Sequence, residues 1–508
     1  MLPLKHSNVS MMDRLGLGCL GLLLLSPLAF KVRLAGDIVV HPFTPFLVVA
    51  WSWTIWAALD SLRQRHGPPV KWNILTPPVL LMGLVIFGLG CSLALNSLWS
   101  GSWQPAGWLL LMKWFLYLAP LPFTALLVIR NGPRVMRLLN IMIPMTALVT
   151  VVYSFVRLIQ DPAAGYAHGR SESEPRYFVM GMFGEVLSND GLVVRSDTVS
   201  QGAYGMYLAL VVLFSIALAL VKGMDGGLPR WYTRGQVFVV WPAAIPGILY
   251  TGSRSTLILL SGVVFTFMLV LFWRGAGVLK ESHIAGFIIS LLLVVSASSW
   301  GISAYAPVSY TTLQRLQDTA KGRFEIRESA LGSFSPLSTN EARTSSVRNV
   351  ESRVWLWGKI VRYLTEHPIA LLTGMGNDRR RFLEEVIGLS YEGDHVHFQT
   401  AHNLFLDVLI KGGVINLAIL TGGCTWLLML PLKAVAAGAR SMQSKALLGI
   451  GFTLLSFWPS FIIINLIGEE MFTDNLQLHW TMLFGLLLGL LSISAHLSQS
   501  PRTEQAIT

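Results

Sequence analysis

Long apolar runs recur along almost the whole of this 508-residue chain, and they constrain its fold more than any other feature. A run of about 17–25 apolar residues can cross a bilayer as a helix. Such runs stand near residues 15–34, 40–59, 74–95, 105–129, 135–158, 201–221, 236–251, 255–273, 284–305, 413–430, 446–467 and 476–495. Only 13% of the residues are charged, against about 25% in a soluble domain. The sequence therefore predicts an all-α integral membrane protein with about twelve transmembrane helices.

Basic residues in the short connections predict the orientation of these helices. With the N-terminus in the cytoplasm, Lys and Arg collect in cytoplasmic connections, which lie near 63–71, 130–137, 222–234, 274–280 and 433–445. Lys31 and Arg33 are the exception. No small-residue cleavage site follows the first run, so we expect an uncleaved first helix and two cytoplasmic termini. The net charge of +11 is explained by this orientation, and we expect no nucleic-acid partner, since no basic patch is interleaved with aromatic residues.

Two long polar segments fall on the opposite, periplasmic side. The first, 160–200, interrupts residues 1–305, which hold the first nine predicted helices. The second, 306–402, is the larger and precedes three more helices in 403–497 and a cytoplasmic tail at 498–508. Apolar residues at spacings of three and four predict an amphipathic helix over 347–366, which we expect to lie on the membrane surface. The residues of this stripe are Val350, Val354, Trp357, Val361 and Leu364.

His402 lies where the larger polar segment meets a membrane-length apolar run. A helix that begins near it places His402, Leu406 and Gly413 on one face, with the histidine at the water interface. An imidazole in water has a pKa near ambient pH, so it can take a proton from an attacking hydroxyl. The two interpretations are a catalytic base and an interfacial histidine that caps the helix.

Two further histidines, His395 and His397, alternate in the same segment and would point the same way if it is extended. Together with His402 they raise the alternative of a three-histidine metal site. No carboxylate stands at a recognised metalloenzyme spacing, and solvated loop histidines explain the pair equally simply. The three cysteines lie inside apolar runs and offer no metal spacing either. We therefore predict no metal and no cofactor.

Two arginines are the candidate anion ligands. Arg254 stands in a short break between two apolar runs on the periplasmic side, where an unpaired charge is costly and a lipid phosphate would be a good partner. Arg353 flanks the apolar stripe of the predicted 347–366 helix, four residues before Trp357. The alternatives are a snorkelling interface arginine for Arg254 and a solvated surface charge for Arg353.

This set of motifs resembles the O-antigen ligase family, the polytopic enzymes that join or polymerise lipid-linked bacterial surface glycans. The resemblance rests on four motifs in order: Ser253-Arg254 before a span; Ser352-Arg353 with Trp357; Pro368 followed by Gly374-Met-Gly376; and His402-Asn403 with Leu406 and Gly413. They cover about 250–420, roughly a third of the chain. Two residues depart from the family pattern, since Asn416 stands where a glycine is usual and Lys411 precedes Gly412.

The resemblance implies a GT-C-like membrane glycosyltransferase of the bacterial inner membrane, with its active site facing the periplasm. The donor would be a glycan on undecaprenyl pyrophosphate, and the reaction would be metal-independent and inverting. It implies that His402 activates the acceptor hydroxyl and that Arg254 and Arg353 hold the pyrophosphate, with Asn403 and Trp357 also at the substrate.

Three other functions stay open at this point. A ligase uses the lipid A core as acceptor, which the motifs favour slightly, whereas a polymerase uses a second lipid-linked repeat. A twelve-helix transporter or flippase is a different class, but transporters show internal repeats and ionisable residues near the bilayer midplane, and neither pattern is visible here. A non-catalytic assembly scaffold is the third alternative.

Overall fold

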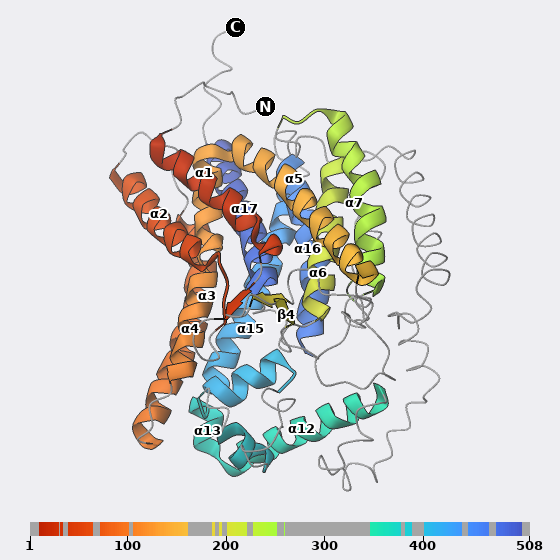
Figure 1. The fold of residues 1–508 in the computed structure, drawn as a ribbon. Coiled ribbons are helices and arrows are strands. Elements are labelled where there is room, and N and C mark those ends of the chain that lie inside the picture. Colours follow the sequence, from red (N-terminus) through yellow and green to blue (C-terminus); the bar gives the residue numbers. More distant parts are fainter. Residues whose placement is uncertain are drawn as a thin grey trace.

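The computed structural model describes residues 10–29, 31–33, 39–63, 72–100, 105–160, 185–187, 193–195, 201–220, 227–250, 259, 346–376, 381–388, 401–438, 445–466 and 474–499. Helices dominate this part of the chain (Figure 1). They are α1 (Met11–Leu24), η1 (Ser26–Leu28), α2 (Thr44–Arg63), α3 (Trp72–Ser100), α4 (Pro105–Tyr117), α5 (Pro120–Gln160), α6 (Gln201–Leu220), α7 (Arg230–Tyr250), α12 (Ser346–Glu366), α13 (Pro368–Thr373), η4 (Phe382–Ile387), α15 (Leu404–Gly438), α16 (Lys445–Asn465) and α17 (Asp474–Gln499).

Within the described residues, 6 helices are long and apolar enough to cross a membrane. They are Thr44–Arg63, Ile74–Leu95, Leu111–Ser154, Leu404–Ala436, Ala446–Asn465 and Leu476–Ala495. The chain is therefore a multi-pass membrane protein, as predicted. The runs predicted at 255–273 and 284–305 lie, apart from residue 259, outside the described residues, so the total of twelve stays a prediction.

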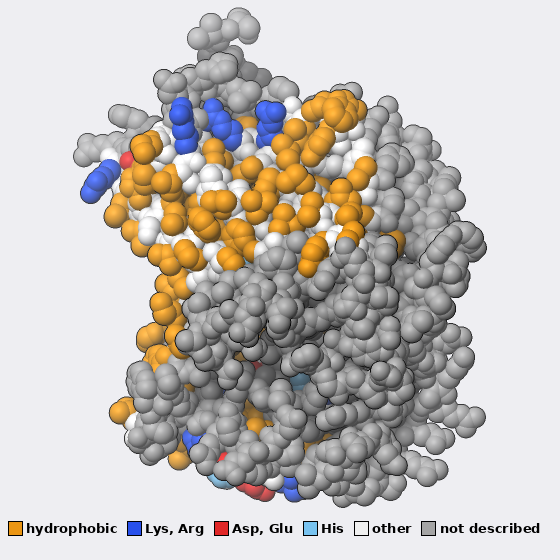
Figure 2. Space-filling view, viewed as in Figure 1, with side chains coloured by type: hydrophobic (Ala, Val, Ile, Leu, Met, Phe, Trp, Pro, Cys, Tyr) orange, Lys and Arg blue, Asp and Glu red, His pale blue; other side chains and the backbone are white. Residues whose placement is uncertain are grey.

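One face of the molecule shows the pattern of a membrane protein directly. Figure 2 shows a broad hydrophobic band below a row of Lys and Arg side chains at the top edge. The start of α1, the end of α2 and the kink of α5 meet at Arg130, and exposed arginines lie near this meeting point, namely Arg14, Arg63, Arg134 and Arg137. Helices α12 and α13 lie at the opposite end of the bundle, below α15 (Figure 1).

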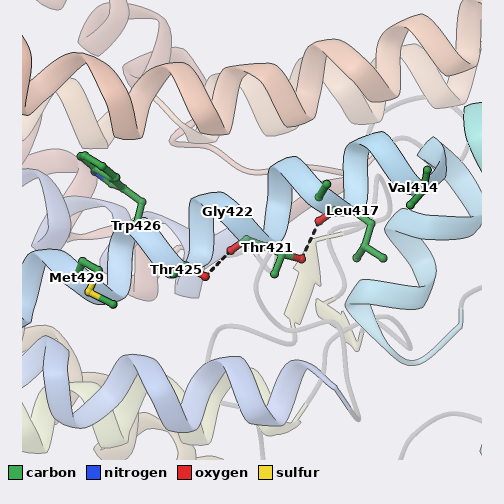
Figure 3. Close-up of a pocket in the computed structure, with 8 residues that line it drawn as sticks. Val414, Leu417, Thr421, Gly422, Thr425, Trp426 and Met429 are labelled. Atoms are coloured by element: carbon green, nitrogen blue, oxygen red, sulfur yellow. Dashed lines mark hydrogen bonds between the residues drawn. The ribbon is translucent and has the colours of Figure 1, made fainter.

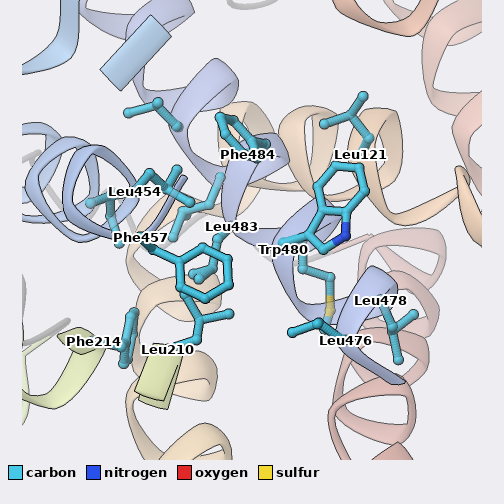
Figure 4. Close-up of a cluster of buried hydrophobic side chains, with 14 of the residues drawn as sticks. Leu121, Leu210, Phe214, Leu454, Phe457, Leu476, Leu478, Trp480, Leu483 and Phe484 are labelled. Atoms are coloured by element: carbon cyan, nitrogen blue, oxygen red, sulfur yellow. The ribbon is translucent and has the colours of Figure 1, made fainter. Parts of the chain in front are cut away.

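The core of the bundle forms where α17 packs against α5 and α16. Gly485 and Gly489, four residues apart on α17, bring its backbone against the carbonyls of α5, where any side chain would collide with them. Large aromatic residues fill the other side, and the rings of Trp458 and Phe484 meet edge to face with centroids 4.9 Å apart. Figure 4 shows this cluster, in which α5, α6, α16 and α17 all contribute side chains.

The predicted connection at 130–137 is a kink inside α5 and not a loop. Asn131 has non-helical angles (φ −138°, ψ 35°), but the helix continues on both sides of it. Arg130, predicted as a loop charge, donates from Nε to Asp13 at 2.9 Å and from an Nη to Asp60 at 2.8 Å. These contacts join α5 to α1 and α2. The prediction failed here because pairing of Arg130 with carboxylates distant in sequence is not visible in local composition.

Four short strands accompany the helices in the described part of the chain. They are β1 (Lys31–Arg33), β2 (Val39–Val40), β3 (Glu185–Leu187) and β4 (Val193–Arg195), and the sheet order is β2-β1-β3-β4. β1 pairs with β3 in parallel, and the other two pairs are antiparallel. The first helix therefore ends at Leu24, earlier than the predicted run of 15–34, and Lys31 and Arg33 lie on the same side of the bundle as residues of the 160–200 segment.

Helix α12 confirms the amphipathic helix predicted over 347–366, but its buried face differs from the predicted stripe. The buried residues are Leu356, Ile360, Tyr363 and Leu364, while Val361 is 51% exposed. These residues share a core with η4, Met375, Ala401 and Ile410. Two apolar stripes overlap on this helix, and the stripe that packs against η4 is the buried one. Helices α12, α13 and η4, which we call the outer unit, thus pack together onto the start of α15.

Two glycine-dependent turns join this unit to α15. Gly413 interrupts α15 with φ 76° and ψ 179°, and Gly374 has φ 77° and ψ 168°, a region that essentially only glycine adopts. Carbonyls before a helix break lack intrahelical partners. Those of Ile410 and Lys411 accept hydrogen bonds from the N–H groups of Met375 (2.8 Å) and Gly376 (3.0 Å). The Gly374-Met-Gly376 turn therefore replaces the bonds that the Gly413 break removes.

We expect Arg130→Ala to loosen α1 and α2 from α5, because it leaves two carboxylates without their shared cation. The loss in folding free energy should fall between the roughly 1 kcal/mol of an exposed pair and the roughly 3–5 kcal/mol of a buried one. Thermal unfolding of the detergent-purified protein measures it. Arg134→Ala, at an exposed position one turn away, is the control; equal melting temperatures for the two variants would contradict the structural role of Arg130.

We expect Gly413→Ala to detach α13 from α15. The new Cβ would collide with the Leu372 carbonyl and would hold alanine in a backbone region it rarely adopts. Limited proteolysis should then cut the α12–α13 segment faster than in the wild type. Gly358→Ala is the control, since it lies on an exposed part of α12 with nothing within 4 Å of the new Cβ, and it should leave the cleavage rate unchanged. An unchanged rate in Gly413→Ala would show that the junction does not depend on this glycine.

Candidate active site

Asn403 forms the N-terminal cap of α15 and so determines where His402 lies. Its side-chain oxygen accepts the N–H groups of Phe405 (3.0 Å) and Leu406 (3.1 Å), which are among the donors that a helix start leaves unsatisfied. Asn403 itself is 7% exposed. The helix therefore begins directly after Asn403, and His402 is the residue just before this cap.

His402 has a backbone conformation that few residues adopt. Its φ is 47°, and no other non-glycine residue in the described part of the chain has a positive φ. A residue in the left-handed region costs about 1–3 kcal/mol, which persists only where the surroundings hold it. Such strain is concentrated at functional sites, so it is an observation in favour of a functional role for this half-buried histidine.

The preceding residue, Ala401, is held from both sides. Its N–H donates to Asp407 Oδ1 at 3.2 Å, and its carbonyl oxygen accepts the indole N–H of Trp357 at 2.8 Å. Ala401 is fully buried. These bonds, together with the Asn403 cap, fix the chain before and after His402, which explains how the strained conformation is maintained.

The Trp357 bond brings the arginine of α12 to the same region. Arg353 and Trp357 are four residues apart, so they lie on one face of α12, and this face meets the segment that carries His402. Arg353 is half-buried. The structure thus links α12, through Trp357, to the segment that carries His402 and Asn403, while the approach of Arg353 to His402 stays a prediction.

Asp407 is a residue that the sequence interpretation overlooked. It is 6% exposed, bonds Ala401 and forms an ion pair with Lys411 one turn later. The sequence did contain a signal for this ion pair, because a carboxylate and a cation stand four residues apart in an otherwise apolar helix start. The pair also explains the departure at Lys411, since Asp407 neutralises its charge.

The other departure, Asn416, has a packing role. Its amide donates to the Gly412 carbonyl at 3.1 Å and it lies against Gly88 of α3, where any side chain on Gly88 would collide with it. Ser92, one turn further along α3, donates to the Lys411 carbonyl at 2.7 Å. Helix α3 therefore supports the Gly413 break together with the Gly374-Met-Gly376 turn, since both donate to the Lys411 carbonyl.

A hydrogen bond between Tyr363 and Glu385 joins α12 to η4. The Tyr363 hydroxyl donates to Glu385 of η4 at 3.2 Å. Burial, and then the nearby carboxylate of Glu385, raise the pKa of Tyr363 above its ordinary value. The hydroxyl therefore remains a donor at neutral pH and ties α12 to η4.

Three candidates lie outside the described residues: Arg254, His395 and His397. Whether Arg254 approaches His402, and whether the two histidines join it, therefore stay predictions. Among the residues that the structure does describe, no group of three or more His, Cys, Asp or Glu side chains could hold a metal ion.

The comparison with known families agrees with the interpretation of this region. Residues 238–421 match the family described as O-antigen ligase, a stretch that runs from α7 past the Gly413 break. No curated protein and no solved structure matches the chain. The match covers Arg254, Arg353, His402 and the glycines that join α13 to α15. Over these residues, about a third of the chain, the protein is therefore similar to the O-antigen ligase family.

Proposed function

We propose that this protein transfers a glycan from undecaprenyl pyrophosphate to an acceptor hydroxyl at the periplasmic face of the inner membrane. The match of residues 238–421 to the O-antigen ligase family supports glycosyl transfer of the ligase or polymerase type. The observation that carries the proposal is the strained His402, held between α12 and α15 next to the face that bears Arg353. Strain that several elements maintain is expected of a residue whose position matters for chemistry.

The chemistry assigns one task to each group. The His402 imidazole takes the proton of the acceptor hydroxyl as its oxygen attacks the anomeric carbon. The bond from that carbon to the pyrophosphate oxygen breaks from the opposite side, so the configuration inverts and undecaprenyl pyrophosphate leaves. Arg353 and Arg254 stabilise the charge that grows on the leaving group, and guanidinium groups match phosphate oxygens in geometry. We propose no metal in this step.

Asn403 and Trp357 have a positioning role in this proposal. Their observed contacts, the cap on α15 and the bond to Ala401, hold the backbone on either side of His402. Substrate contacts by the Trp357 ring or by Asn403 stay a prediction. Loss of either positioning contact would release the strained φ and move the imidazole away from the acceptor.

We also propose that this end of the bundle faces the periplasm at the lipid headgroups. The opposite end carries the exposed arginines in Figure 2, and basic residues favour the cytoplasmic side. The outer unit carries exposed apolar side chains, with Ile369 61%, Leu372 55% and Val361 51% exposed. The Leu372 backbone lies against Gly413, which is inside the candidate membrane span Leu404–Ala436. Helix α13 would then lie at the membrane surface.

His402→Ala should lower the rate of transfer by about 10²- to 10⁴-fold, the usual contribution of a general base, and leave the protein folded. The assay follows transfer from a purified undecaprenyl pyrophosphate-linked glycan in the presence of EDTA, with lipid A core and a second lipid-linked repeat tried as acceptors. Transfer to the core alone supports a ligase, and transfer to the repeat alone supports a polymerase. Wild-type activity in His402→Ala, or an activity that needs a divalent ion, would overturn the mechanism.

Arg353→Lys should keep the charge but lose the paired N–H donors of the guanidinium. We expect transfer to fall roughly 10- to 100-fold, which corresponds to the 1.5–3 kcal/mol of one charged hydrogen bond. Arg362→Lys, at an exposed position nine residues later on the same helix, is the matched control and should keep full activity. Equal rates for the two variants would remove Arg353 from the leaving-group site.

A further inference from the structure

The edge of the bundle opposite α12 carries a row of Lys and Arg side chains (Figure 2). At the meeting point of α1, α2 and α5, Arg130 binds both carboxylates that these three helices contain, Asp13 and Asp60. Four exposed arginines surround this triad, and within the described residues none of the four forms an ion pair. They are Arg14, Arg63, Arg134 and Arg137. Their charge is therefore available to an anion from outside the protein.

Two of these arginines, Arg14 and Arg134, flank the junction of α1 with α5. Arg14 directly follows the aspartate that binds Arg130, and Arg134 stands four residues after Arg130. A Cβ on Gly21, which is two turns after Arg14, would lie 3.9 Å from the Leu138 side chain. Leu138 in turn is one turn after Arg134. The faces of α1 and α5 that bear the two arginines therefore meet along this junction.

Exposed apolar side chains lie beside these arginines on the same helices. Met11 is 83% exposed and Leu15 is 45% exposed, on either side of Arg14 in α1. At the end of α2, Leu62 is 69% exposed directly before Arg63. The surface thus presents cations and apolar groups at one level. This combination is typical of residues at the boundary between lipid headgroups and acyl chains.

The exposed face of α15 between Val414 and Met429 provides a contrast (Figure 3). The residues that line it carry no charge, and the hydroxyls of Thr421 and Thr425 donate to carbonyls of their own helix, at 2.7 Å and 2.8 Å. Such a face has no group that distinguishes one lipid from another. The arginines of α1 and α5 do have such groups, because a guanidinium binds phosphate oxygens through paired N–H donors.

We propose that the α1–α5 junction binds an anionic phospholipid, with its phosphate between Arg14 and Arg134 and its acyl chains along the apolar residues of α1. Charge complementarity favours an anion, since this end of the three helices carries five arginines against two aspartates. The apolar neighbours favour a lipid, because a nucleotide or an acidic protein would leave Met11 and Leu15 in water. The site does not depend on the proposed transfer reaction. With the orientation proposed above, the lipid belongs to the cytoplasmic leaflet.

The test measures binding of dioleoyl phosphatidylglycerol and dioleoyl phosphatidylcholine to the detergent-purified full-length protein by native mass spectrometry. We expect roughly tenfold tighter binding of phosphatidylglycerol, because the choline group would bring a second cation to the arginines. Arg14→Gln/Arg134→Gln should weaken phosphatidylglycerol binding roughly 25-fold, since each cation near an anionic lipid contributes about fivefold. Arg362→Gln/Lys433→Gln is the matched control, which removes the same charge from exposed positions elsewhere and should change binding less than about twofold.

Three results would overturn the proposal. Equal affinity for the two lipids would show that the arginines only extend toward water. An equal loss of binding in the control variant would show a general effect of net charge. Displacement of phosphatidylglycerol by excess inorganic phosphate, at matched ionic strength, would show a site for free anions and not for a lipid.

A second measurement separates lipid binding from folding. Thermal unfolding is followed in nanodiscs of phosphatidylcholine alone and of phosphatidylcholine with about a third phosphatidylglycerol. A ligand that binds only the folded protein raises its melting temperature. Phosphatidylglycerol should therefore stabilise the wild type and the control but not Arg14→Gln/Arg134→Gln, and all three should melt together in phosphatidylcholine alone. An equal rise in all three, or a lower melting temperature of the Arg14→Gln/Arg134→Gln variant in phosphatidylcholine alone, would overturn the lipid site.

Discussion

The break in α15 at Gly413 is the constraint on which the outer part of this molecule depends. A helix that stops inside a membrane protein leaves carbonyl groups that must find donors, because the hydrocarbon core supplies none. Here the Gly374-Met-Gly376 turn and Ser92 of α3 supply them. The break thereby creates a binding surface for a segment of the chain that otherwise has only a small core of its own. A continuous helix at this point would give α13 nothing to bond.

This junction also explains how a strained histidine is maintained. Three interactions stabilise the region around His402. The Asn403 cap and the Asp407–Lys411 pair lie within the start of α15, and the Trp357 bond joins this region to α12. A strain of about 1–3 kcal/mol is of the same size as one or two such hydrogen bonds. The strained conformation is therefore stable only while α12 remains docked, so the position of His402 depends on the same helix that carries Arg353.

Sequence reasoning succeeded here where a pattern is local. Apolar runs predicted the helices and spacing predicted α12, because each depends on neighbouring residues. The break at Gly413 was not predicted, since the sequence placed His402, Leu406 and Gly413 on one face of a helix. It failed where the partner is far along the chain. The pairing of Arg130 with Asp13 and Asp60, and the parallel pairing of β1 with β3, depend on contacts that no local window contains. The prediction of the buried face of α12 was wrong for a related reason. Two apolar stripes overlap on this helix, and the position of η4 determines which of them is buried.

The two glycines at 422 and 423 show how a single helix can satisfy two demands at once. Adjacent positions on a helix point about 100° apart, so one can face a protein neighbour while the next faces lipid. Gly423 brings α15 close to α3, and α3 in turn supports the Gly413 break through Ser92 and Gly88. Gly422 leaves the outer side open. The contacts with α3 therefore follow α15 from Gly423 back to the Gly413 break, so one neighbouring helix supports both the span and the break.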